Sequence, residues 1–325
     1  MNDVSVRLIT RSGDLPVMQC RNFFHSVAFF KILEGTSGMT PCMAVVQNGI
    51  GEVVAHMLAV ISRRRTLLTP FLFRFAHVYG EGEYEEGTDV KSVFSRMLEA
   101  LTSRFRRAMC LYCEFSELSS KMFGYGAFRA NGYFPIPWQE VHNSLHSMHP
   151  DNRLGERIQR RVAASHRYGV QTAPSDSDAD TAAYIKLLRR YFKFKSRRHI
   201  PSNTLFQTLA ATKNGVNIVT KLKGRVIGGC TMVFSGRNAY MWFMASRRKS
   251  YHFCYPAEQT VIGALRYAYD KGYDHMFFLD AGLPFKRSPY REFVMSFGGK
   301  PVAKYHWFKF PLPWLNRVYS WLYNE

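Results

Sequence analysis

Apolar residues along the chain follow two patterns, one typical of helices and one typical of strands. Each pattern predicts the secondary structure of the stretches in which it occurs. In residues 90–107 apolar side chains recur every three or four positions, which indicates an amphipathic helix. Residues 42–65 instead hold two apolar runs separated by Asn48-Gly49, a pair typical of tight hairpin turns. The same criteria predict helices over 21–34, 178–192, 203–215 and 256–272, and strands within 71–82, 109–115, 216–246 and 275–280.

The order of these elements occurs twice. Residues 126–138 and 291–305 hold equivalent places, since each contains a glycine stop that leads into a closing strand. We therefore expect an α/β fold of two tandem domains, each a mixed, mostly antiparallel sheet flanked by helices. The expected domains are residues 1–150 and 151–311, followed by an aromatic tail over 312–325.

The charge of the chain is strongly positive: 44 lysines and arginines against 24 acidic residues leave a formal net charge of +20. Such an excess attracts polyanions, namely nucleic acid, anionic lipid or phosphate-bearing small molecules. Residues 153–200 hold twelve basic and four acidic residues, which fits either a phosphate-facing surface or a solvated helix face. No stretch is apolar enough to span a bilayer and the N-terminus shows no signal pattern, so we expect a cytoplasmic protein.

The six cysteines show no paired spacing, and several fall within apolar runs, so buried reduced thiols are expected. The pair Cys110 and Cys113 has the spacing of redox and zinc motifs. It lies within an expected strand, however, where residues three apart face opposite sides of a sheet. Neither a shared metal ion nor a redox pair is favoured there, and we expect no metal site.

Four segments carry a resemblance to a known family: LGERIQRRVAASHRYGV (154–170), GRVIGGCTMVFSGRNAYMWFMAS (224–246), YPAEQTVIGALRYAYDKGYDHMFFLDAG (255–282) and YREFVMSFGGKPV (290–302). With the order of elements, they resemble the acyl-CoA N-acyltransferase (GNAT) fold. Two copies in one chain resemble the Fem family of aminoacyl-tRNA-dependent transferases, which add amino acids to peptidoglycan precursors. They equally resemble the double-GNAT acetyltransferase-like proteins.

The resemblance implies two tandem GNAT-like domains and an N-acyltransferase that moves an aminoacyl or acyl group to an amine on a cell-envelope precursor. Acyl-CoA or aminoacyl-tRNA would be the co-substrate, with no permanently bound cofactor. The acceptor would be lipid-linked or nucleotide-linked, with the protein peripheral at the inner face of the membrane. Family members usually carry a lysine after the phenylalanine of the final helix, where this chain has Val294. The alternative is a catalytically inert tRNA- or membrane-surface-binding protein on the same fold.

The segment SRRKSYHFCYP (246–256) is the candidate donor site. It follows an expected strand, carries Arg247, Arg248 and Lys249, and enters a helix near Pro256. In a GNAT-like fold the pyrophosphate of the donor would bind here, where helix N-terminal amides and basic side chains converge. The glycine-rich pattern of an acetyl-CoA binder is absent, which favours a different donor. A solvated basic turn is the alternative.

Asp280 is the candidate catalytic residue. It ends an expected strand, where α/β sheets place ligand-facing residues, and its carboxylate could take a proton from the incoming amine. A turn cap before Gly282 is the alternative. The candidates for binding the acceptor are basic or aromatic residues near these segments, namely Lys195, Arg197, Arg198, Tyr255, Lys286 and Arg291.

The aromatic tail has apolar residues at helical spacing, namely Trp314, Leu315, Val318, Trp321 and Leu322. We expect this helix to dock its apolar face onto the core of the protein. The alternative is an interfacial helix at a lipid surface, which would suit a lipid-linked acceptor.

Overall fold

The computed structural model describes residues 5–65, 72–193, 199–279 and 281–323, and the chain folds into two compact units. Unit 1 comprises residues 1–138 and 303–325, and unit 2 comprises residues 139–302. The division expected from the sequence assigned 139–150 to the first domain and 303–311 to the second. In the structure, residues 139–150 belong to unit 2 and residues 303–311 belong to unit 1. The boundaries fall inside strands, because β7 (Phe134–Ser144) and β13 (Lys300–Lys309) each contribute residues to both units.

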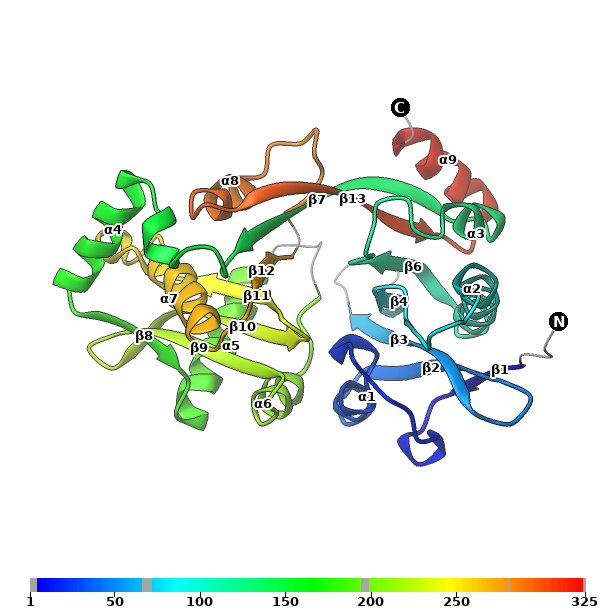
Figure 1. Ribbon diagram of the computed structural model, residues 1–325. Coiled ribbons are helices and arrows are strands. Elements are labelled where there is room, and N and C mark those ends of the chain that lie inside the picture. Colours follow the sequence, from blue (N-terminus) through cyan, green and yellow to red (C-terminus); the bar gives the residue numbers. More distant parts are fainter. Residues whose placement is uncertain (1–4, 66–71, 194–198, 280, 324–325) are drawn as a thin grey trace. The chain divides into compact units, whose positions relative to one another are not determined.

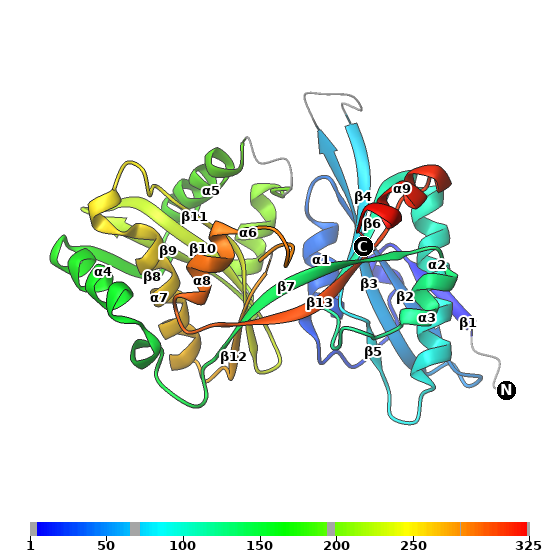
Figure 2. The same ribbon diagram turned by 90° about the horizontal axis from the view of Figure 1, so that it is seen from above.

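Unit 1 contains a sheet in the order β1-β2-β3-β4-β6-β13, with α1 and α2 on opposite faces (Figures 1 and 2). All its described pairings are antiparallel except β4 with β6. Its elements besides β7 and β13 are β1 (Ser5–Ile9), β2 (Met39–Gln47), β3 (Val53–Arg65), β4 (Leu72–Tyr79), β5 (Glu83–Tyr84), β6 (Cys110–Ser116), α1 (Val27–Glu34), α2 (Val90–Arg107), α3 (Tyr125–Ala130) and α9 (Pro313–Tyr323).

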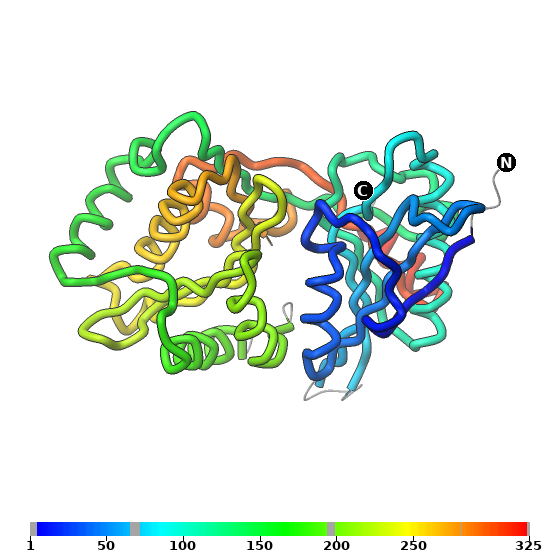
Figure 3. The backbone as a smooth tube through the Cα atoms, turned by 60° about the horizontal axis from the view of Figure 1, so that its bottom comes forward, coloured from blue at the N-terminus to red at the C-terminus, as the bar shows by residue number. Residues whose placement is uncertain are grey.

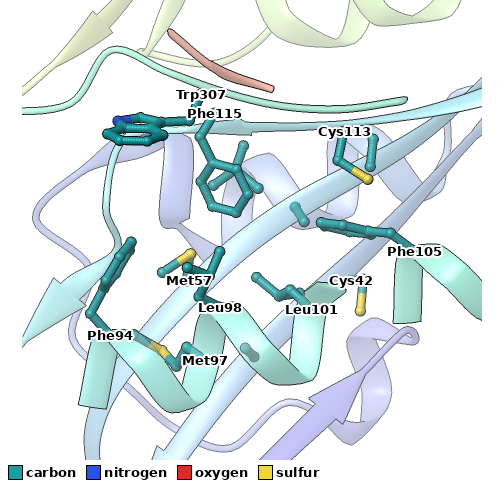
Figure 4. Packing of buried hydrophobic residues seen from close by; sticks show 14 of the residues in the cluster. Cys42, Met57, Phe94, Met97, Leu98, Leu101, Phe105, Cys113, Phe115 and Trp307 are labelled. Atoms are coloured by element: carbon teal, nitrogen blue, oxygen red, sulfur yellow. The ribbon is translucent and has the colours of Figure 1, made fainter. Parts of the chain in front are cut away.

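The apolar stripe of α2 forms the centre of the unit 1 core. Figure 4 shows Phe94, Leu98 and Leu101 of this helix facing the sheet, together with Phe115 of β6 and Trp307 of β13. Each of these side chains is at most 1% exposed. The bounds expected for this helix from the periodicity, residues 90–107, are confirmed.

Three expectations about unit 1 were wrong. The single helix expected over 21–34 is divided at Ser26, because its hydroxyl accepts the N–H of Phe29 and caps α1. Cys110 and Cys113 lie in one core cluster, since a bulge at Leu111 shifts the register of β6 against β4. Burial raises the pKa of both thiols. Of the six cysteines expected to be buried and reduced, five are buried and free, and Cys20 is exposed.

The strands of unit 2 follow one another in the order β7-β12-β11-β10-β9-β8, and their described pairings are antiparallel except β11 with β12. Helices α4 and α7 cover one face, and α5 and α6 cover the other (Figure 3). Its elements besides β7 and β13 are β8 (Val170–Pro174), β9 (Gly215–Leu222), β10 (Arg225–Ser235), β11 (Asn238–Ser246), β12 (His275–Phe278), α4 (Glu156–Arg167), α5 (Asp178–Phe192), α6 (Asn203–Ala210), α7 (Pro256–Asp270) and α8 (Pro289–Met295).

Adjacent glycines in β10 let a helix approach each face of this sheet closely. A Cβ on Gly228 would lie 2.7 Å from Thr260 Oγ1 of α7, and a Cβ on Gly229 would lie 2.7 Å from the ring of Tyr184 on α5. Successive residues of a strand point to opposite faces, so the two glycines serve opposite helices. The start of α7 is thereby held directly on β10.

The last helix of unit 2, α8, carries Val294 in the core. The side chain is 0% exposed and belongs to the cluster that also contains Phe297. Gly298 follows the helix with φ of 86°, a conformation that glycine adopts without strain. The glycines of this segment therefore end α8 and turn the chain into β13.

The expectation that the apolar face of the tail would dock onto the core was wrong. The tail forms the helix α9, all of whose residues the structure describes, and none of them is buried. Among the described residues, no helix combines the length and the hydropathy needed to cross a bilayer.

Candidate donor site in unit 2

The two parallel strands of unit 2 separate after a short pairing. Residues of β11 pair with β12 only from Asn238 with His275 to Met241 with Phe278, although β11 continues to Ser246. The chain after β12 stays beside β7, since the N–H of Gln139 donates to the carbonyl of Gly282 at 2.9 Å. The edge of β11 beyond Met241 is therefore not covered by β12, and we call this region the β11–β12 opening.

A β-bulge lies where the opening begins. Thr231 of β10 pairs with Phe243 and Met232 pairs with Met241, so Trp242 is the additional residue on β11. A bulge bends its strand and increases its twist, which turns β11 away from β12. The bent strand is held from α5, because the hydroxyl of Tyr184 donates to the carbonyl of Phe243 at 3.2 Å.

Buried hydrogen bonds connect this bulge to the rest of the sheet. The Thr231 hydroxyl lies 3.1 Å from the Tyr184 hydroxyl and donates to Asn217 Oδ1 at 2.8 Å. The amide of Asn217 donates in turn to the carbonyl of Phe206 on α6. All three side chains are at most 1% exposed, so their polar atoms need these partners and restrict the strand to one position.

The N-terminus of α7 lies at the far end of the opening. Tyr255 precedes the helix with φ of 45° and ψ of 52°, a left-handed conformation that is strained for a tyrosine. Pro256 begins the helix, and the first N–H groups of any helix have no partner within it. They carry a partial positive charge that suits an anion.

The loop between β11 and α7 brings the three basic donor-site candidates to this helix end. The backbone of Arg247 is fixed, since its N–H donates to Ile227 at 2.8 Å and its carbonyl accepts from Tyr251 at 3.0 Å. Its Nε atom is buried and has no hydrogen-bond partner among the described residues. Arg248 and Lys249 are exposed. The loop thus offers one partly buried guanidinium with unused donor capacity and two solvent-facing cations.

Helix α4 supports this end of α7, through residues that the sequence did not single out. Arg161 donates to Glu258 at 2.7 Å and lies 5.4 Å from the ring centre of Tyr255. Ser165 donates to the carbonyl of Cys254 at 2.6 Å. Glu258 is only 1% exposed, so Arg161 compensates a buried carboxylate. At least one cation of the basic stretch 153–200 therefore forms an ion pair within unit 2 and does not face solvent as a free charge.

The remaining sequence candidates fall into two groups. Lys286 is exposed on the chain that follows β12, and Arg291 of α8 donates to the carbonyls of Leu283 and Lys286 at 2.7 and 3.0 Å. The observed contacts of Arg291 therefore hold this loop. The other candidates, Asp280, Lys195, Arg197 and Arg198, lie outside the described residues.

Unit 1 has no equivalent of the opening in its described residues. Its parallel strands β4 and β6 pair from Arg74 with Cys110 to Tyr79 with Ser116, the last residue of each strand. The pairing then continues, because the N–H of Gly80 donates to the carbonyl of Ser116 at 2.7 Å. The two units share an order of elements, but only the sheet of unit 2 opens between its parallel strands in the part of the chain that the structure describes.

Comparisons with known proteins agree with this geometry. Residues 156–287 match the family model described as an acetyltransferase (GNAT) domain, and this segment contains the opening, the basic loop and α7. FemX has a similar structure, with 11% identity, a TM-score of 0.61, and coverage of 92% of this chain and 94% of that one.

Two further solved structures are similar. A tandem GNAT protein from the clavulanic acid biosynthesis pathway shows 11% identity and a TM-score of 0.59, covering 87% of this chain and 86% of its own. L-PGS from Bacillus licheniformis shows 12% identity and a TM-score of 0.58, covering 90% and 92%. No curated protein sequence matches the chain. The chain has a Fem-like double-GNAT fold, as the sequence predicted.

A separate titratable cluster lies in unit 1. Cys20, His56 and Glu83 bring a thiol, an imidazole nitrogen and a carboxylate oxygen within 4.8 Å of one another, a spacing that could hold a metal ion. Desolvation disfavours protonation of His56, but Cys20 and Glu83 outweigh it and raise its pKa to about 9. Burial and the nearby His56 lower the pKa of His25 to about 3.

The two histidines predict a maximum of stability near pH 6.5. The contribution of His56 is complete below its unfolded pKa of 6.5 and is lost as the pH rises to about 9, a difference of about 3 kcal/mol. The contribution of His25 has the opposite sign and is lost as the pH falls from 6.5 to about 3. Urea unfolding of His56→Gln between pH 6.5 and 9 is expected to lack the alkaline loss. An exposed control, His252→Gln, should keep it, and equal slopes in both variants would contradict the assignment.

Proposed function

We propose that this protein is an N-acyltransferase of the Fem/GNAT type, which binds an acyl or aminoacyl donor in unit 2. The observation that carries the proposal is the β11–β12 opening, which begins at the bulged Trp242 and ends at a basic loop and a helix N-terminus. A phosphate-bearing donor fits an open strand edge that leads to a basic loop and a helix N-terminus. Its phosphates would lie at Arg247 and the first turn of α7, and its acyl group would lie along the open edge of β11.

Acyl transfer to an amine requires few catalytic side chains. The amine nitrogen attacks the acyl carbonyl carbon, a tetrahedral intermediate forms, and the bond from carbon to the thiol or ribose oxygen of the donor breaks. Backbone N–H groups of Met244–Ser246 that face away from β10 are candidates to stabilise the oxyanion, because alternate residues of a strand direct them to that side. We assign Asp280 the role of accepting the proton that the amine loses, which then passes to the leaving group.

The charge of the chain favours aminoacyl-tRNA as the donor. The formal net charge is +20, and the segment 246–256 contains no glycine. The contacts would be to phosphates rather than to base edges, and would therefore weaken steeply with salt. Acyl-CoA is the alternative donor. We propose an amine on a cell-envelope precursor as the acceptor, with Tyr255, Lys286, Lys195, Arg197 and Arg198 as its contacts.

The test is transfer itself, measured with charged tRNA or acetyl-CoA and an amine acceptor. Reversing Arg247, Arg248 and Lys249 to glutamate should weaken donor binding by about tenfold or more. The matched control reverses three exposed lysines elsewhere in unit 2, Lys186, Lys213 and Lys271, and should change donor binding by less than about twofold.

Equal effects of the two triple variants would rule out the site, because they change the net charge by the same amount. Transfer activity with neither donor, together with salt-sensitive RNA binding, would favour the inert RNA-binding alternative.

A further inference from the structure

Helix α9 presents an apolar face to solvent. Trp314, Val318, Trp321 and Leu322 are 62%, 51%, 67% and 57% exposed. The last three follow Trp314 by four, seven and eight residues, so all four lie on one side of the helix. A soluble surface rarely exposes two tryptophans and two aliphatic residues together, and such patches mark interaction sites.

The polar side of α9 fixes this orientation. Asn316 Oδ1 accepts the N–H of Phe310 at 3.0 Å, and its Nδ2 donates to the carbonyl of Gly132 at 2.8 Å. The ring of Tyr319 stacks on Phe310 with centroids 4.8 Å apart. The helix is thus attached to unit 1 by one side, and its apolar face points outward as a consequence. Figure 1 shows α9 beside α3 and the end of β13.

A basic pocket lies beside the apolar face. It has a volume of about 430 Å³ and is lined by Arg129, Gly132, Tyr133, Phe134, Asn316, Arg317, Ser320 and Trp321. Two arginines and no acidic residue contribute to it, and neither Arg129 nor Arg317 forms an ion pair with a described residue. Residues 313–323 contain no acidic residue either. An exposed apolar strip therefore borders a cationic pocket.

We propose that α9 binds the surface of an anionic lipid bilayer, with its apolar face in the headgroup region and a lipid phosphate between Arg129 and Arg317. Tryptophan side chains favour the headgroup region of a bilayer, because the ring is apolar and its N–H can reach water. The net charge of +20 adds attraction to an anionic surface. Two arginines fit a phosphate, whereas a protein partner would require no such charge. This inference stands without the acyltransferase proposal, but it would explain how an acceptor carried by a lipid reaches the enzyme.

Sedimentation of the full chain with vesicles tests the proposal, without donor or acceptor. Vesicles of phosphatidylcholine with phosphatidylglycerol should retain the protein about tenfold better than phosphatidylcholine alone. Trp314→Ser with Trp321→Ser should weaken binding to the anionic vesicles by about tenfold or more. The control variant, Ile50→Ser with Phe285→Ser, removes apolar residues outside α9 that are 80% and 68% exposed, at least as much as the tryptophans, and it should bind as the wild type does.

A second variant separates the pocket from the apolar face. Arg129→Gln with Arg317→Gln should remove most of the preference for anionic over neutral vesicles. The proposal is overturned if the tryptophan variant sediments as the wild type does. It is also overturned if α9 instead joins two copies of the chain, which a lower oligomeric state of the tryptophan variant without vesicles would show. Failure of the transfer assay leaves this result unaffected, because the vesicle assay measures binding alone.

Discussion

Replacing Val294 with lysine is expected to lower the free energy of unfolding by about 4 kcal/mol, since burial shifts the pKa of a lysine by several units at about 1.4 kcal/mol each. Val294 is 0% exposed and packs in the core of unit 2, where its charged replacement would have no aqueous contact. Urea denaturation measures the difference. Val294→Met is the matched control, because methionine has a similar length without the charge and should cost about 1 kcal/mol.

Comparing the two variants tests what the valine at position 294 means, since family members usually carry a lysine there. If lysine and methionine at position 294 cost the same, the lysine reaches solvent and the space around α8 is open toward a site. If lysine costs much more, the position is a core position in this chain. The positive charge at the site must then come from other residues, such as Arg247, whose buried Nε has no hydrogen-bond partner among the described residues.

A single added methyl group at Gly228 is expected to destabilise the protein by about 2 kcal/mol and to weaken donor binding by about tenfold. The Cβ would lie 2.7 Å from Thr260 Oγ1 and 3.2 Å from the carbonyl oxygen of Pro256. Thr260 cannot rotate away without losing its hydrogen bonds to Thr220 and Pro256, both 2.8 Å long. The start of α7 must therefore move off β10, which displaces the helix amides from the opening.

A double-mutant cycle distinguishes this mechanism from a general loss of stability. In the background Thr260→Ala the clashing oxygen is absent, so Gly228→Ala should cost clearly less than it does alone. Gly126→Ala, at a helical glycine with no atom within 4 Å of the added carbon, should leave stability and donor binding unchanged or slightly improved. Full additivity of Gly228→Ala and Thr260→Ala would contradict the proposed contact.

Local signals account for the elements that the sequence predicted best. Helix α5 has the predicted bounds, because a hydrophobic period coincides with a capping residue: Ser177 Oγ accepts the N–H of Asp180 at 3.2 Å. The hairpin of β2 and β3 turns at Asn48-Gly49 for a similar reason, since Asn48 Oδ1 accepts the N–H groups of Ile50 and Glu52. Such signals act within a few residues and can be read without the fold.

The bulges, the opening and the unit boundaries have no such signal. Trp242 reads as one more apolar residue in a strand, and only its pairing with β10 shows that it is the extra residue. The same holds for Leu111, whose bulge places Cys110 and Cys113 in one core. Arg161 and Glu258 were missed because they are 97 residues apart in the chain and meet only through the packing of α4 on α7.

Four features could be predicted without the structure: the order of elements, their duplication, the excess of positive charge and the basic loop before α7. These follow from hydrophobic period, turn chemistry and composition, which are properties of neighbouring residues. The packing of the folded chain is needed to show that the opening lies in unit 2, that Val294 lies in the core, and that the apolar face of α9 points outward. Each of these depends on which distant strand or helix occupies the adjacent space, and no local pattern encodes that choice.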